Sequence, residues 1–330
     1  MSQPSAAPEA RPAKRQRVDD EEEGLTRSDI WHDDGSVVLR VERTLFRVHW
    51  TVLCLHSSVF RDLRGIPQPP EEPQIEGCPV VELHDDTQDI TLFLTALYNP
   101  HRLSEEIMTL DFIGAIVRIG RKYDVQNLLK PVVQRLAREH PTTFENYEAT
   151  TQVHRHTISW TSNQVSHYEG LIFDIVTLAR ANNLLTLLPC AYLRVVLFCD
   201  LAWILDGVTK DDGSKVTLSF QDQRACILGR QKLQQAQWEH EPFASWIRSS
   251  TPAAGCKRPE FCTRRLGVIY EAVVHNGMML PPFLLVGYNI LCTVCQPHHL
   301  RIMKDAREKM WQNLPTFFDL PPWADLKDGL

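Results

Sequence analysis

Several motifs that mark enzymes are missing from this 330-residue sequence. It contains no G-x-S-x-G, P-loop, G-x-G-x-x-G or H-E-x-x-H pattern, each of which would position a nucleophile, a phosphate or a metal. Its first 23 residues hold no apolar stretch of the kind that a secretory signal needs. These absences favour an intracellular protein that is not an enzyme and has no small-molecule substrate.

A long uninterrupted apolar run is missing as well. The segment 272–300 contains no Asp, Glu, Lys or Arg, but Pro281 and Pro282 divide it. The 13 residues from Phe283 to Cys295 fall short of the roughly 20 that span a bilayer. The sequence therefore predicts a buried core helix at 283–295 and no membrane contact.

Charge is modest overall and segregated at the N-terminus. The net charge is -6, which argues against a direct nucleic-acid partner for the whole chain. Residues 1–28 are rich in Pro, Ala and charge, so we expect a disordered tail. The basic run that includes Lys14, Arg15 and Arg17 predicts a nuclear import signal, hence a nuclear or nucleocytoplasmic protein; the alternative is a solubilising tail.

Hydrophobic periodicity predicts an α+β domain at 29–140. Strands are expected at 36–41, 44–49 and 79–83, and helices at 51–56, 58–63, 87–98, 110–122 and 125–139. Ser57 and Asp86 precede helical patterns, and both residue types are good N-caps. The order of two strands, a helix pair, a strand and further helices is typical of a compact α+β module.

This domain resembles a BTB/POZ domain. The resemblance rests on Asp34 at the first strand, on His49 at the end of the hairpin, and on the Ser-x-x-Phe motif of Ser57 and Phe60. It implies that these four residues are structural, and that the domain associates with itself as a homodimer or binds another protein. Trp50 replaces a residue that is usually basic in the family, so it is either a partner contact or a core residue.

The resemblance extends over residues 29–328, to a group of BTB proteins abundant in mushroom-forming fungi. It rests on Ala179-Arg180, on 187–192, on Cys292-x-x-Cys295 and on the aromatic C-terminal residues. Apolar helical spacing predicts a mostly α-helical domain at 141–295, with helices at 171–180, 184–203, 220–237 and 260–275 and a strand at 215–218. Residues 296–330 are expected to form a helix and an aromatic, non-helical tail that packs back on this domain. An exposed peptide ligand is the alternative.

The nine cysteines are an odd number spread over a long chain, which favours a reducing compartment over a disulfide scaffold. Cys256 and Cys262 are separated by five residues, and Cys292 and Cys295 by two. Two such pairs of thiolates predict a structural zinc site, in which His298 or His299 could replace one cysteine. The alternative is four reduced, partly buried thiols. The other cysteines fit apolar core positions.

Two functions follow from the resemblance. The first is a non-enzymatic protein–protein interaction protein, with a role in nuclear regulation if the basic run is read by the import machinery. The second is a substrate adaptor for a cullin-type ubiquitin ligase. Many such BTB adaptors carry a hydrophobic-x-Glu signature after the second helix, but the segment 60–71 shows no clear copy of it.

Overall fold

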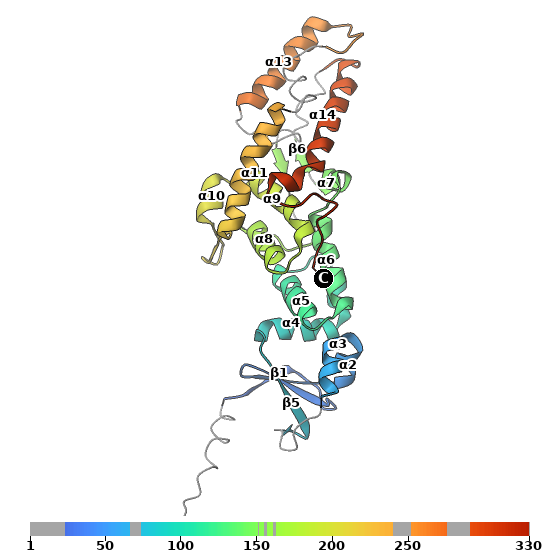
Figure 1. The fold of residues 1–330 in the computed structure, drawn as a ribbon, viewed down its shortest axis with the longest axis vertical. Helices are drawn as coiled ribbons and strands as arrows, with labels where there is room; N and C mark the ends of the chain where they lie inside the picture. Colours follow the sequence, from blue (N-terminus) through green and yellow to red (C-terminus); the bar gives the residue numbers. More distant parts are fainter. Residues whose placement is uncertain are drawn as a thin grey trace, which may run out of the picture. The chain divides into compact units, whose positions relative to one another are not determined.

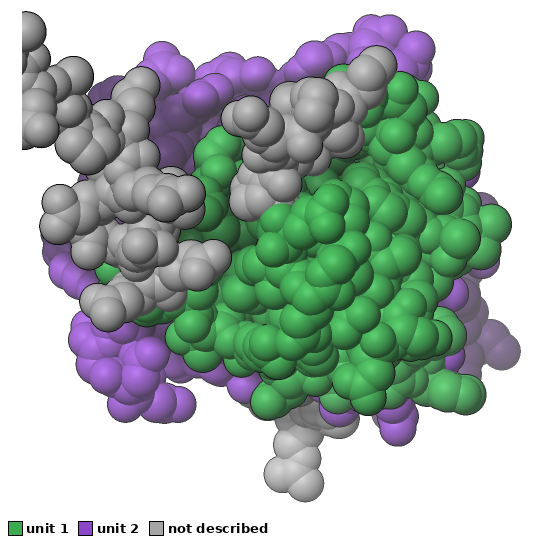
Figure 2. Space-filling view, turned by 90° about the horizontal axis from the view of Figure 1, so that it is seen from below, with its two compact units in different colours: residues 1–102, 119–128 green, residues 103–118, 129–330 purple. Residues whose placement is uncertain are grey.

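The structure is a computed structural model, and it describes residues 24–66, 74–150, 152–154, 157–160, 163–239, 252–275 and 291–329. The chain divides into two compact units, one of residues 1–102 and 119–128 and one of residues 103–118 and 129–330 (Figure 2). This division differs from the expected domain boundaries at 140 and 295. The segment 1–23, which includes the import candidates Lys14, Arg15 and Arg17, lies outside the described residues.

A five-stranded sheet forms the base of the first unit, with the order β1-β3-β2-β5-β4 (Figure 1). The strands are β1 (Thr26–Trp31), β2 (Val37–Val41), β3 (Thr44–Val48), β4 (Gln74–Ile75) and β5 (Cys78–Leu83). β2 pairs antiparallel with β3 and parallel with β5, and β1 pairs parallel with β3. The first unit is thus a small sheet followed by helices, which agrees with the expected α+β class.

The β2–β3 hairpin turns without glycine. Glu42 has a φ of +51°, in the left-handed region that glycine adopts more easily. Its carboxylate accepts a hydrogen bond from the Thr87 hydroxyl at 3.0 Å. This contact ties the strained corner to the start of helix α4 (Thr87–Tyr98).

A serine joins the two short helices α2 (Trp50–His56) and α3 (Ser58–Arg64). The Ser57 hydroxyl accepts a hydrogen bond from the backbone N–H of Phe60 at 3.0 Å, which confirms the predicted cap. The same hydroxyl donates to the carbonyl of Tyr123, and the Phe60 ring stacks on the Tyr123 ring. Ser57 therefore fixes the helix pair to the segment that follows α5 (Leu110–Lys122).

Replacing Ser57 with alanine is expected to lower the free energy of unfolding of the first unit by about 2 kcal/mol, because a cap and a buried hydrogen bond are lost together. Urea denaturation followed by circular dichroism measures this loss. Ser58→Ala is the comparison, since Ser58 starts the same helix but caps nothing, and its hydroxyl donates to the Asp124 carboxylate at an exposed site, so that its loss should cost less. Equal losses in the two variants would contradict the assigned role of Ser57.

The second unit is mostly helical (Figure 1). The helix α6 (Gln126–Glu139) ends in it. The helices that follow are α7 (Phe144–Thr150), α8 (Leu171–Ala181), α9 (Leu188–Phe198), α10 (Leu201–Asp206), α11 (Phe220–Glu239), α13 (Pro259–His275), α14 (Cys295–Gln312) and α15 (Leu314–Phe317). α9 packs against both α8 and α11. Short 3-10 helices lie at Pro100–Ser104 and Leu185–Leu187.

Three local expectations for this half need correction. The single helix expected at 184–203 is divided, because Cys199 and Asp200 take extended backbone between α9 and α10. The hairpin of β6 (Gln152–His154) and β7 (Thr157–Ser159) was not expected, and the strand expected at 215–218 is the shorter β9 (Lys215–Val216), which pairs with β8 (Val208–Thr209). The tail, which was expected to be non-helical, contains the short helix α15. Pro315 is compatible with it because it lies in the first turn, where a backbone N–H has no helical partner.

A buried charged pair lies inside the second unit. The Arg194 guanidinium stacks on the Trp160 ring at 4.1 Å and lies 3.9 Å from the Glu139 carboxylate. That carboxylate accepts hydrogen bonds from the backbone N–H groups of Asn163 and Gln164, both at 2.7 Å, and from the indole N–H of Trp160 at 3.1 Å. The pair thus holds the segment after β7 against α6 and α9.

The C-terminal aromatic residues pack on other helices of the second unit. Trp311 lies 4.7 Å from the Tyr147 ring and donates its indole N–H to the carbonyl of Thr142 at 2.9 Å. Phe318 lies 5.3 Å from the Tyr192 ring, and Trp323 donates to the carbonyl of Trp311. These contacts make the tail part of the core of this unit rather than an exposed ligand.

Among the described residues, no helix has both the length and the apolar character needed to span a bilayer. The buried helix expected at 283–295 lies largely outside the described residues.

Candidate metal centre

Four cysteines meet at the starts of two helices. Cys256 lies in the turn before α13 and Cys262 in the first turns of that helix, while Cys292 precedes α14 and Cys295 is its first residue. Gly255 takes a φ of +83° beside Cys256, and Pro259 begins α13. The turn at Gly255 and the helix start at Pro259 place Cys256 just before α13, close in sequence to Cys262.

The four sulfur atoms lie within 4.8 Å of one another, and Cys256 Sγ is 3.6 Å from Cys292 Sγ. Sulfur atoms bound to one tetrahedral zinc ion at about 2.3 Å are about 3.8 Å apart. The cluster therefore already has nearly the dimensions of a four-thiolate metal site. Neither His298 nor His299 belongs to it; their rings pack on each other at 5.1 Å.

Backbone N–H groups point at three of these sulfurs. Cys295 N–H donates to Cys292 Sγ at 3.4 Å, Arg258 N–H to Cys256 Sγ at 3.4 Å, and Ala253 N–H to Cys295 Sγ at 3.3 Å. The donors facing Cys292, from Cys295 and Val294, lower the pKa of its thiol to about 6. Hydrogen bonds of this kind orient metal ligands and favour the thiolate form that binds a metal.

The site sits in a small apolar cluster. Cys262 and Cys295 are fully buried, whereas Cys256 and Cys292 are partly exposed. The other buried members of the cluster are Ala253, Leu266, Leu291 and Ala306. Among the described residues this is a small apolar cluster, and a metal ion bound by the four sulfurs would add a cross-link to it.

The four residues on which the BTB/POZ resemblance rests lie in the first unit, in two separate groups. His49 Nε2 lies 3.1 Å from an Asp34 carboxylate oxygen, and its Nδ1 lies 3.0 Å from the Tyr98 hydroxyl. The hydrogen bond from His49 is the main reason why the pKa of Asp34 is lowered. The structure thus joins Asp34 to His49, in an arrangement that connects the hairpin to α4, while Ser57 and Phe60 meet Tyr123 as described above.

Trp50 is only 8% exposed, and its backbone N–H donates to the Ser36 hydroxyl at 3.0 Å. This burial supports core packing for Trp50, because a side chain so enclosed offers little area to a partner.

Two features of the second unit were not expected from the sequence. One is the buried pair Glu139 and Arg194, and the other is a pocket between α8 and α9–α10 that includes Glu169 and Trp203. A charged residue within an apolar helical pattern, as at Arg194, is the one sequence signal that pointed to the pair. The pocket is lined by residues between 160 and 208 that are far apart in the sequence, so no local sequence pattern indicated it.

No family model and no curated protein sequence matches this chain.

Proposed function

We propose that this chain is a non-enzymatic protein–protein interaction protein. Its first unit acts as a BTB/POZ-type association module, and a structural zinc ion cross-links the helical region around α13 and α14. The observation that carries the interaction proposal is the exposed apolar surface of the α2–α3 pair. The observation that carries the zinc proposal is the four-sulfur cluster.

The α2–α3 region exposes large apolar side chains. Leu55 is 72% exposed in α2, Val59 is 37% exposed in α3, and Ile66 is 56% exposed just after that helix. Single exposed apolar residues are common, but three in and just after one short helix pair provide apolar surface of the kind found at interaction sites. A second copy of this chain is the partner that the BTB resemblance implies for such a surface.

A structural zinc ion fits the cysteine cluster better than a catalytic metal ion does. All four ligands are thiolates supplied by the chain, so a tetrahedral ion bound to them keeps no open position for water or substrate. Soft sulfur ligands in this geometry select zinc over magnesium or calcium. The centre would then act as a cross-link between the segments before α13 and α14.

The variant Leu55→Asp is expected to shift the chain from dimer toward monomer, because a carboxylate in a desolvated apolar contact is costly. Size-exclusion chromatography with light scattering at about 20 μM measures the shift. We expect at least a ten-fold weaker self-association, which corresponds to about 1.4 kcal/mol.

Val268→Asp is the control, since Val268 is a 50% exposed apolar residue on α13, in the second unit. It should leave the dimer intact. A wild-type chain that stays strictly monomeric at this concentration contradicts self-association. Copurification of a cullin that is lost in Leu55→Asp would instead favour the ubiquitin-ligase adaptor.

A further inference from the structure

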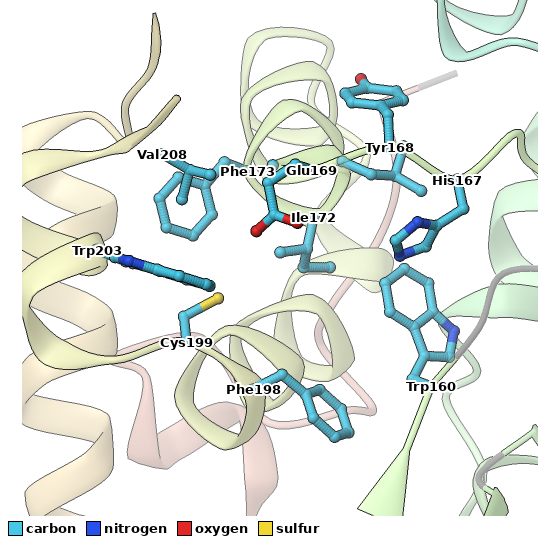
Figure 3. A pocket seen from close by; sticks show the side chains of 12 residues that line it. Trp160, His167, Tyr168, Glu169, Ile172, Phe173, Phe198, Cys199, Trp203 and Val208 are labelled. Atoms are coloured by element: carbon cyan, nitrogen blue, oxygen red, sulfur yellow. The ribbon is translucent and has the colours of Figure 1, made fainter. Parts of the chain in front are cut away.

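A pocket of about 260 Å³ lies in the second unit, between the start of α8 and the α9–α10 junction (Figure 3). Its walls are mostly apolar and aromatic. Trp160, Phe198 and Trp203 contribute rings, and Ile172 and Val208 contribute aliphatic side chains. The volume is below the roughly 300–1,000 Å³ of most cofactor and drug-sized sites, so the pocket suits one side chain or a very small molecule.

One carboxylate lies beside these apolar walls, that of Glu169, which is itself solvent-exposed. Figure 3 shows Glu169 pointing between Trp203, Cys199 and Ile172. Within the described part of the chain, Glu169 makes no hydrogen bond or ion pair, and no lysine or arginine lines the pocket. Lys210, two residues after the pocket residue Val208, is held by Asp174 at 2.6 Å. The carboxylate is thus left without a cation of its own.

The other groups around the carboxylate add to the negative potential or leave it unchanged. Burial, together with the neighbouring charges of Glu169 and Asp200, raises the pKa of the Cys199 thiol to about 12. That thiol is therefore protonated at neutral pH and contributes no charge. His167 lines the pocket on the Trp160 side in Figure 3, away from Cys199. An anionic ligand would meet repulsion here, whereas a cation would be attracted.

We propose that this pocket binds a cationic group on an unbranched apolar stem, with the stem against the aromatic walls and the charge at Glu169. The ammonium of a lysine side chain from a partner protein has this chemistry, and so does a free alkylammonium ion. Aromatic faces attract such cations, and Trp is the best of them. Trp203 is 41% exposed, so its ring remains accessible at the pocket mouth.

This inference deepens the proposed function, because it gives the helical unit its own contact with a basic partner segment. It uses no residue of the α2–α3 surface. Loss of self-association in Leu55→Asp would therefore leave pocket binding unchanged, and failure of either proposal can be told from failure of the other.

The test compares n-butylammonium, which reproduces a lysine side chain, with 1-butanol, its neutral counterpart of equal length. Saturation-transfer NMR titrations on the full chain give a Kd for each probe. We expect butylammonium to bind about ten-fold more tightly, from the combined cation–π and ion-pair terms. Glu169→Gln should reduce this preference to less than two-fold while butanol binding is retained.

Glu145→Gln is the matched control, because Glu145 is an exposed glutamate on α7 that does not line the pocket. It should keep the ten-fold preference. Equal binding of the two probes, no detectable binding of either, or a preserved preference in Glu169→Gln would overturn the proposal. A lysine-containing tripeptide that binds more tightly than butylammonium identifies a protein side chain as the ligand, and equal binding identifies a free amine.

Discussion

Replacing Cys295 with alanine is expected to release zinc from the protein and to unfold the region around α13 and α14. Cys295 is one of two fully buried cysteines in the four-sulfur cluster. Structural zinc in small domains contributes about 10–16 kcal/mol of apparent folding free energy, so its loss should cost this region much of its stability. Hydrogen exchange followed by mass spectrometry should show loss of protection from 291 to 312.

Cys226→Ala is the matched control, because Cys226 is equally buried but lies in α11, outside the cluster. It should retain its zinc and its protection pattern, with only the modest loss that truncating one buried thiol brings. Equal protection of 291–312 in Cys295→Ala and in the wild type would contradict a stabilising metal centre.

Replacing Glu139 with leucine is expected to lower the free energy of unfolding of the second unit by about 3–5 kcal/mol, because it leaves a buried charge uncompensated. Arg194 is 1% exposed, and burial already lowers the pKa of its guanidinium. The substitution also removes the acceptor of three hydrogen bonds, from Trp160, Asn163 and Gln164. Urea denaturation monitored by tryptophan fluorescence measures the loss.

The double variant Glu139→Leu with Arg194→Met separates the cost of the unpaired Arg194 charge from the cost of the lost hydrogen-bond acceptor. Because it removes both charges, we expect it to be more stable than Glu139→Leu alone, although three donors still lack their acceptor. Additive losses from the two single variants would show that the charges do not interact, and would contradict the assignment of a coupled buried pair.

The elements with a local chemical signature could be predicted from the sequence. Ser57 and Asp86 cap their helices as predicted, because a cap depends only on the next three residues. The spacing of Cys292 and Cys295 indicated a ligand pair, since two intervening residues bring both sulfurs to one helix start. The sequence could not decide whether the more widely spaced Cys256 and Cys262 would join them, which the structure now shows.

The remaining features depend on long-range packing. β1 pairs in parallel with β3. Its sequence, TRSDIW, lacks the clear alternation of apolar and polar residues that predicts a strand. The Glu139–Arg194 pair joins residues from two helices, and although Arg194 stands out in an apolar pattern, nothing near it in the sequence identifies Glu139 as its partner. Glu169 became notable only once the structure placed it beside the apolar pocket between α8 and the α9–α10 junction. No short window of sequence contains any of these relations.

Zinc content tests the central claim most directly. The full chain, purified under reducing conditions without added metal, should contain about one zinc ion per chain by inductively coupled plasma mass spectrometry, and Cys295→Ala should contain none. Less than a few tenths of an equivalent in the wild-type protein, iron in place of zinc, or an equal zinc content in Cys295→Ala would contradict the proposed centre.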